Sequence, residues 1–259
     1  MATQRERLIR LRKALIANLE AVARAGQQLA SLDAVAVDAQ QVWNAQAAAL
    51  LQAFSSDTTQ KIFREKAWRA PVSTLQDRVR QVATDAAAMM HAVTALRGED
   101  AEFAHKLACG EVEQILLTFE AIVRRLAKRR GERSPFVIDN EYDVQYLLQA
   151  LLAIHFRDVR AEEGVPSHIG ANSRIDFFLG EEQIAIEVKA TRDGLDDHQL
   201  GNQLLEDVAR YKKHTDVKTL YFFIWDPAHH IRNAAGIRND VKRDAGDRAI
   251  HVIFSPPRR

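Results

Sequence analysis

Apolar side chains return every three or four positions from residue 3 to about residue 130, which is the period of an amphipathic α-helix. This half of the chain is rich in alanine, contains few aromatic residues and has almost no β-strand pattern. Turn-forming residues at 55–59, and Gly98 with its acidic neighbours, divide it into roughly four helices. The pattern therefore predicts an all-α first half.

The first predicted helix carries an apolar seam on alternating three- and four-residue steps. Its positions are Leu8, Leu11, Leu15, Val22, Ala25, Leu29 and Leu32, with polar Asn18 at one seam position. This spacing is that of a coiled coil, and an ordinary intramolecular bundle accommodates it equally well. We expect residues 1–134 to form a helical bundle or coiled-coil domain that serves dimerisation or sensing.

The period changes after Gly131, Ser134 and Pro135, which places a domain boundary between residues 134 and 135. The expected elements are a helix at 141–156, strands at 159–162, 174–179 and 183–190, a helix at 197–214, and strands at 220–225 and 251–254. The order αβββαβ, followed by a closing strand, predicts an α/β core with a mixed central sheet for residues 135–259.

The stretch IAIEVKAT at residues 184–191 has the apolar character of a buried strand but carries two charges, Glu187 and Lys189. Charges are costly to remove from water, so their presence in such a strand calls for a functional or structural reason. Successive side chains of a strand face opposite sides, so Glu187, Lys189 and Ala185 share one face.

An acidic residue on the preceding strand, Asp176, has the matching phase, and a turn at residues 180–181 predicts a hairpin between the two strands. Asp176 and Glu187 are then side by side, where two carboxylates repel each other and favour a shared hard cation such as magnesium or manganese. The alternative is a surface hairpin whose Glu187 and Lys189 face water. The apolar flanking strand and the helix and strand that follow favour a covered, functional site.

Together these segments resemble the PD-(D/E)XK nuclease superfamily, and more specifically the DpnII/MboI-type restriction endonuclease domain of bacterial defence and restriction proteins. The motifs occur in order as EYDVQYLLQALL, SRIDFFL, IAIEVKATRDGL and QLLEDVARYKKH. The resemblance covers about residues 122–256 and implies a restriction-endonuclease-like core. One departure is Ile175, which stands where a proline usually precedes the first aspartate.

The resemblance implies a metal site with a catalytic lysine. Asp176 and Glu187 resemble the metal ligands, with the backbone carbonyl of Val188 as a third. Lys189 matches the residue that positions the attacking water and helps to deprotonate it. A cation polarises the phosphate while a nearby ammonium stabilises the developing charge, so the chemistry is coherent. The expected cofactor is Mg²⁺, with Mn²⁺ as a substitute.

Other residues match the family's site less specifically. Glu141 resembles an additional acidic ligand, and it equally fits a carboxylate that stabilises a helix N-terminus. Gln203 matches a glutamine that orients the lysine or the water. Ser173 and Arg174 are candidates for holding the scissile phosphate, although Arg174 also fits a simple pair with Asp176.

Basic residues crowd the end of the first half in the segment RRLAKRRGER. They are Arg124, Arg125, Lys128, Arg129, Arg130 and Arg133. The run fits phosphate contacts, and it equally fits a solvated charged face. With 36 basic and 35 acidic residues in the whole chain, contact with nucleic acid has to rely on such a local patch.

Several other classes of protein are disfavoured. The single cysteine, Cys109, can form neither an internal disulfide nor a zinc cluster. The sequence shows no signal-peptide pattern and no apolar stretch that could span a bilayer, so we expect a cytoplasmic protein without membrane contact. It also lacks the phosphate-cradling P-loop, the dinucleotide fingerprint and the nucleophile elbow.

The leading hypothesis is a magnesium-dependent endonuclease that cuts DNA in bacterial restriction or antiviral defence. Cutting both strands is simplest with two copies of one site, which predicts a homodimer assembled through the helices. The helical half could also bind a partner protein from a defence system. The alternatives are a nucleic-acid-binding or protein-interaction adaptor with an inactive nuclease-like domain, and an RNase with the same metal chemistry.

Overall fold

The computed structural model describes residues 4–31, 37–53, 61–62, 65–67, 69–128, 134–165, 173–212, 214–246 and 248–258. The chain forms two compact units, Met1–Ala104 and His105–Arg259. This division falls within helix α5 (Asp100–Ala127), earlier than the boundary after residue 134 that the sequence predicts. The later turns of α5 belong to the second unit because they are buried in the same core as its sheet.

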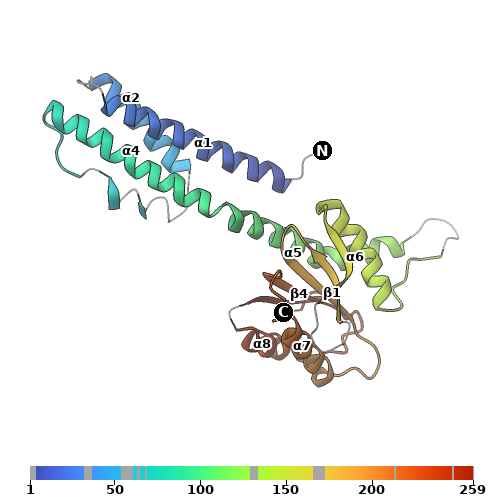
Figure 1. Ribbon diagram of the computed structural model, residues 1–259. Coiled ribbons are helices and arrows are strands. Elements are labelled where there is room, and N and C mark those ends of the chain that lie inside the picture. The colour runs from blue at the N-terminus through green and yellow to red at the C-terminus, as the bar shows by residue number, and fades with distance from the viewer. Residues whose placement is uncertain are drawn as a thin grey trace. The chain divides into compact units, whose positions relative to one another are not determined.

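The first unit is helical, as predicted. Its helices α1 (Gln4–Ala30), α2 (Val37–Ala53) and α4 (Leu75–Gly98) lie alongside one another (Figure 1). Helix α4 ends at Gly98, where the sequence predicts a turn, whereas the turn predicted at 55–59 lies outside the described residues. None of the described helices is long and apolar enough to cross a membrane.

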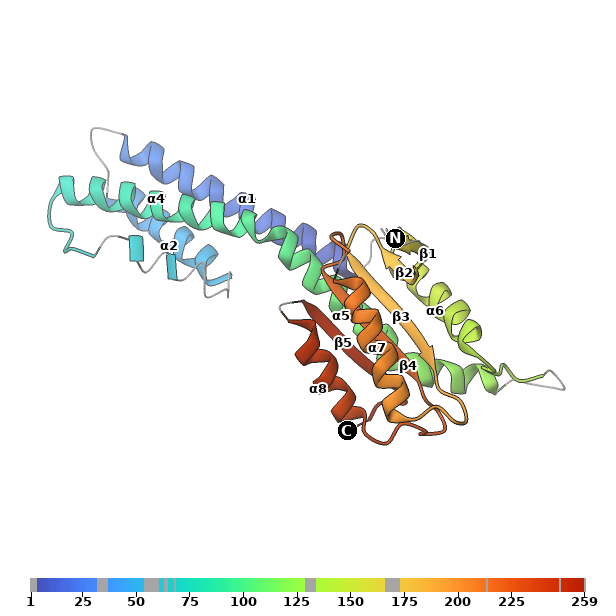
Figure 2. The same cartoon turned by 60° about the horizontal axis from the view of Figure 1, so that its bottom comes forward.

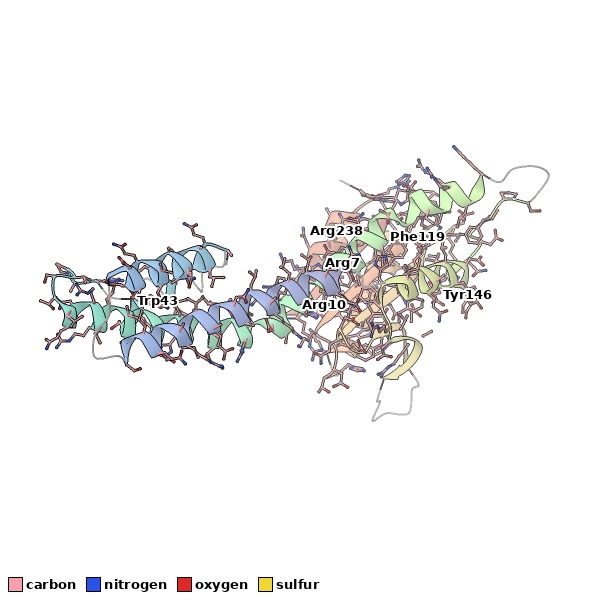
Figure 3. All side chains as sticks on the ribbon, turned by 90° about the horizontal axis from the view of Figure 1, so that it is seen from above. Arg7, Arg10, Trp43, Phe119, Tyr146 and Arg238 are labelled. Atoms are coloured by element: carbon pink, nitrogen blue, oxygen red, sulfur yellow. The ribbon has the colours of Figure 1, made fainter. Side chains whose placement is uncertain are left out.

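The buried stripe of α1 differs from the predicted seam by one position. It consists of Ile16, Leu19, Ala23 and Gly26. Leu11 and Ala25 of the predicted seam are exposed instead. The stripe packs in one core with α4 and with Trp43 of α2 (Figure 3). The Trp43 indole covers Gly26, where a Cβ would lie 2.5 Å from the ring. Its Nε1 also donates a hydrogen bond of 2.8 Å to the Val22 carbonyl.

The second unit is built on a five-stranded sheet in the order β1-β2-β3-β4-β5. The strands are β1 (Val159–Val165), β2 (Ser173–Leu179), β3 (Ile184–Ala190), β4 (Thr219–Trp225) and β5 (Ala249–Ser255). β2 pairs antiparallel with β1 and β3, while β4 pairs parallel with β3 and β5. The mixed sheet, with its closing strand, confirms the predicted restriction-endonuclease-like fold class.

Helices cover both faces of this sheet (Figure 2). α5 and α6 (Glu141–His155) pack on one face, and α7 (Asp197–Tyr211) and α8 (Ala234–Ala245) pack on the other. Strand β4 is buried along its whole length because its alternate side chains enter the two cores. Tyr221, Phe223 and Trp225 enter the first core, and Leu220, Phe222 and Ile224 enter the second.

Helix α8 is the element of the second unit that the sequence pattern did not predict. Its buried stripe includes Ile237, Val241 and Ala245 at helical spacing, but mostly charged and polar residues separate them. The helix connects β4 to β5, and parallel strands need such a crossover between them.

Phe119→Ala should destabilise the second unit by about 3–5 kcal/mol. The Phe119 ring is fully buried, and its centroid lies 5.0 Å from Phe223 and 5.5 Å from Trp225 (Figure 3). Leu117→Ala on the exposed side of the same helix is the matched control, with an expected change within about 0.5 kcal/mol. Urea denaturation followed by circular dichroism measures both, and equal losses would contradict the packing of α5 on the sheet.

Candidate active site

The hairpin of β2 and β3 opens at Asp176. Its described ladder pairs Leu179 with Ile184, Phe178 with Ala185, and Phe177 with Ile186. Ile175 and Phe178 both enter the core beneath α7 and α8, so the alternation of side chains is interrupted between them. The Asp176 carboxylate accepts a hydrogen bond from the Val188 N–H, with Oδ2 and N 2.8 Å apart.

Val188 presents its backbone to this opening. The N–H and C=O groups of one strand residue point to the same side of the strand. Because the Val188 N–H is directed at Asp176 of β2, the Val188 carbonyl is directed toward β2 as well. The carbonyl named as a third ligand from the sequence is therefore on the Asp176 side of β3.

Glu187 and Lys189 lie on the face of β3 that α7 covers. Glu187 is only 5% exposed, and its Oε1 lies 3.0 Å from Lys189 Nζ. Its Oε2 accepts a hydrogen bond of 2.7 Å from the Tyr211 hydroxyl. Lys189 Nζ also lies 3.3 Å from Asp207 Oδ2. Each buried charge thus has a partner, which the cost of desolvation requires.

Helix α7 therefore reaches the site through Asp207 and Tyr211, neither of which was assigned to it from the sequence. Gln203, the residue of α7 assigned there, is exposed and lines a cavity of about 460 Å³ with neighbouring residues of α7 and of the loop before it. Its assigned role stays a prediction. The signal for Asp207 was present in the sequence, because a carboxylate interrupts the buried apolar stripe of α7. That stripe contains Leu200, Leu204, Val208 and Tyr211.

Glu141 is the first residue of α6 and lies beside the end of β3. Its Oε2 accepts a hydrogen bond of 3.1 Å from the N–H of Ala190, the last residue of β3. Asn140 caps the helix by accepting hydrogen bonds from the N–H groups of Tyr142 and Asp143, which fixes the first turn. Glu141 is thus both a carboxylate at a helix N-terminus and a neighbour of the site.

A comparison with protein families decides what kind of domain holds this arrangement. The family model REase_DpnII-MboI matches residues 110–257. The chain belongs to the DpnII-MboI restriction endonuclease family. Neither a curated protein nor a solved structure matches the chain. Membership of the family confirms the resemblance seen in the motifs and supports a DNA endonuclease, and the matched region begins within α5.

The oxygen atoms at the opening of β2 and β3 fit the divalent metal that the DpnII-MboI family typically uses. Asp176, Glu187 and the Val188 carbonyl are hard oxygen ligands, and Mg²⁺ is usually held by one or two carboxylates while it keeps several waters. Within the described ranges, no three His, Cys, Asp or Glu side chains form a ready-made metal cluster. A Mg²⁺ site with only two protein carboxylates agrees with this preference for few protein ligands and with the absence of a larger cluster among the described residues.

Burial changes the proton affinity of the Asp176, Glu187 and Lys189 side chains. The pKa of Asp176 rises to about 7, first because burial disfavours its charge and next because Glu187 is close. Burial also raises the pKa of Glu187, against the opposing effect of Lys189. Burial works to lower the pKa of Lys189, but the carboxylates of Glu187 and Asp207 outweigh it and raise that pKa above its usual value. Lys189 is therefore an ammonium at neutral pH.

The residues predicted to contact DNA are only partly within the described chain. Arg125 and Lys128 are exposed at the end of α5. Arg129 and Arg130 lie outside the described residues, and so do the side chains of Ser173 and Arg174, whose backbone begins β2. Contact of these residues with DNA stays a prediction.

Asp176→Asn should raise the melting temperature of the metal-free protein at pH 8. The folded protein retains the Asp176 proton up to about pH 7, whereas the unfolded chain loses it near pH ~4. Folding therefore takes up a proton between these values, and the wild type loses stability as the pH rises through them. An uncharged amide avoids this loss, and its oxygen can still accept the Val188 hydrogen bond.

Thermal melts in EDTA at pH 5 and pH 8 measure this effect. The melting temperature of the variant should rise by about 2–4 °C for each kcal/mol of unfolding free energy gained over the wild type, and the rise should be larger at pH 8 than at pH 5. Asp158→Asn is the control, because a hydrogen bond from Arg160 lowers the pKa of this partly exposed carboxyl and no gain at pH 8 is expected. A variant at Asp176 that melts no higher than the wild type at pH 8 would contradict the raised pKa.

Proposed function

We propose that the protein is a Mg²⁺-dependent endonuclease that hydrolyses DNA phosphodiester bonds, with Mn²⁺ as an effective substitute. The observation that carries this proposal is that three groups surround one residue of β3 in a DpnII-MboI domain. The Asp176 carboxylate contacts the N–H of Val188, and the chain neighbours of Val188 are Glu187 and Lys189. Two acidic groups and one ammonium around one residue are the parts that metal-assisted phosphodiester hydrolysis uses.

Each of these residues has a distinct role in the proposed reaction. Asp176, Glu187 and the Val188 carbonyl would hold the cation, with Glu141 as an additional acidic neighbour. The chemistry supplied by a bound divalent cation is polarisation of the phosphate and activation of water. Lys189 would orient the attacking water and offset the negative charge that develops on the phosphate. Its raised pKa suits it to act as a cation and not as the base.

Contact with the DNA backbone is proposed for basic residues on two segments. Arg125 and Lys128 are exposed at the end of α5, and Arg129 and Arg130 continue the same basic run. Such residues contribute affinity through phosphate contacts without reading sequence. Ser173 and Arg174 are proposed to hold the scissile phosphate, because they precede Asp176 on the same strand.

The family membership also supports a biological setting. We place the activity in bacterial restriction or antiviral defence, in the cytoplasm, where foreign DNA is encountered. Residues 1–134 would then serve dimerisation or sensing, including contact with a partner protein of a defence system. A homodimer supplies one site for each strand of the duplex.

Glu187→Gln and Lys189→Met should each lower DNA cleavage by at least about 100-fold. The first change removes a proposed ligand charge, and the second removes the proposed cation. Glu206→Gln, an exposed position on α7, is the matched control and should cut normally. Plasmid, linear duplex, single-stranded DNA and RNA are incubated with Mg²⁺, with Mn²⁺ and with EDTA, and the products are separated on gels.

Activity on DNA that needs the metal and both residues would support the proposal. Cleavage of RNA alone would instead support the RNase alternative. If no substrate is cut with either ion by the wild-type protein, the adaptor without nuclease activity is favoured. Unchanged cutting by both variants would show that the site lies elsewhere.

The 259-residue chain should sediment as a dimer at micromolar concentration. Leu11 is a large apolar residue that is 58% exposed on α1, so it is available for contact with a second copy. Leu11→Glu should shift the protein toward the monomer and convert double-strand cuts in plasmid DNA into nicks. Lys13→Glu on the same helix is the control. A wild-type protein that sediments as a monomer, including when bound to DNA, would exclude this arrangement.

A further inference from the structure

The buried face of α7 holds both charged residues of β3 in place. We propose that Tyr211 and Asp207 are positioning residues of the site, Tyr211 for the metal ligand Glu187 and Asp207 for Lys189. This inference rests on the proposed nuclease function and extends it to residues that do not themselves touch the substrate. The two residues are four positions apart on one helix, a spacing that places their side chains on the same face.

Tyr211 fixes one of the two carboxylate oxygens of Glu187. Its side chain is buried with Leu204 and Val208, and its hydroxyl donates a hydrogen bond of 2.7 Å to Glu187 Oε2. Burial, and then the nearby Glu187 carboxylate, raise the pKa of Tyr211, so the hydroxyl remains a donor. Because Oε2 is held, the direction of Oε1 is set as well.

Asp207 provides Lys189 with a second counterion, on a different element from Glu187. It is 4% exposed, and its Oδ1 lies 3.0 Å from Arg210 one turn further along the helix. Its Oδ2 is buried without a hydrogen bond among the described residues and faces Lys189 Nζ across 3.3 Å. A buried carboxylate oxygen is costly to leave without a hydrogen bond, and here its charge is balanced by the ammonium.

The two contacts together separate the functions of Glu187 and Lys189. Without Asp207, the ammonium would be paired with Glu187 Oε1 alone, the oxygen that Tyr211 leaves available. With Asp207, Lys189 keeps an anchor when Glu187 Oε1 is engaged by a cation. Tyr211 should therefore matter most for metal affinity, and Asp207 should matter most for turnover.

Helix α7 is itself firmly placed. Its N-terminus has a capping box formed by Asp196 and Gln199. Asp197 accepts hydrogen bonds of 2.7 and 3.1 Å from the N–H groups of Arg232 and Asn233, in the segment before α8. The face that carries Tyr211 and Asp207 is therefore held at a fixed position relative to the sheet.

The test uses Tyr211→Phe and Asp207→Asn in the whole 259-residue chain, each with a matched control. Tyr221→Phe also removes the hydroxyl of a buried tyrosine, one that bonds Glu113 and the Cys109 carbonyl on the other face of the sheet. Asp240→Asn removes an aspartate that pairs with an arginine three residues later, as Asp207 does, but on α8. Mn²⁺ affinity is measured by titration calorimetry, and kcat on plasmid DNA is measured at saturating Mg²⁺.

Tyr211→Phe should weaken Mn²⁺ binding by about 10–100-fold while kcat at saturating metal changes by less than about 3-fold. Asp207→Asn should lower kcat by about 10–100-fold and weaken Mn²⁺ binding less than Tyr211→Phe does. Both control variants should match the wild type in both measurements. A purely structural role would lower metal affinity and kcat together and reduce thermal stability, so the split between the two readouts is the decisive result.

The inference is overturned if the wild type binds Mn²⁺ and cuts DNA while Tyr211→Phe and Asp207→Asn behave like their controls. It is also overturned if both variants lose affinity and kcat in parallel. A wild-type protein that neither binds Mn²⁺ nor cuts DNA would overturn the proposed function itself. This result differs from failure of the positioning roles alone, in which the wild type still binds Mn²⁺ and cuts DNA.

Discussion

The second unit depends on compensating the charge of Glu187, because this residue is buried in a strand that is covered on both faces. Strand β3 lies at the centre of the sheet and contributes Ile184, Ile186 and Val188 to one core and Ala185 to the other. A carboxylate at such a position is destabilising unless it is paired and hydrogen-bonded. Lys189 and Tyr211 supply these partners, and the same two contacts orient the groups that the proposed chemistry needs.

The mixed topology explains how the fold makes room for a site beside a buried strand. On the side of β4 the pairing of β3 is parallel and continues from Ile184 to Ala190. On the side of β2 the described pairing ends at Ile186, and the next contact is made by the Asp176 side chain. One edge of β3 is therefore paired with β4 along its whole length. At the other edge, the backbone beyond Ile186 is available to the Asp176 side chain and to the proposed cation. The carboxylate of Asp176 replaces a backbone acceptor at the point of divergence.

Much of this arrangement could be predicted from the sequence because it depends on short-range patterns. The alternation in IAIEVKAT placed Glu187 and Lys189 on one face, and their contacts with Tyr211 and Asp207 show that this is the face covered by α7. The order of strands and the α7 helix followed from periods of two and of three to four residues. Asp176 was proposed because a hairpin fixes the register of its two strands, and in the structure the described ladder ends one residue away, at Phe177.

What the sequence did not reveal depends on contacts between distant segments. Periodicity identifies α5 as a helix, but it does not show that Phe119 packs against β4. The predicted boundary therefore followed the turn-forming residues after the helix, Gly131, Ser134 and Pro135. The seam of α1 was displaced by one position because contacts with α4 and with Trp43 of α2 determine which side is buried. Asp207 was overlooked because only the tertiary structure shows that a carboxylate in an apolar stripe faces an ammonium. α8 was missed because polar residues dilute its stripe.

The charge balance around β3 places a further constraint on function. Among the described side chains, Asp176, Glu187, Asp207 and Glu141 contribute carboxylates, whereas Lys189 and Arg210 contribute positive charges. An excess of negative charge repels a phosphodiester, and a partly retained proton on Asp176 reduces that repulsion only in part near neutral pH. The exposed basic residues at the end of α5 are separate from this group of charges, and their proposed role is to attract DNA to the surface. Positive charge that enters with the scissile phosphate would offset this excess, so the charge balance of the described side chains supports the proposed metal dependence.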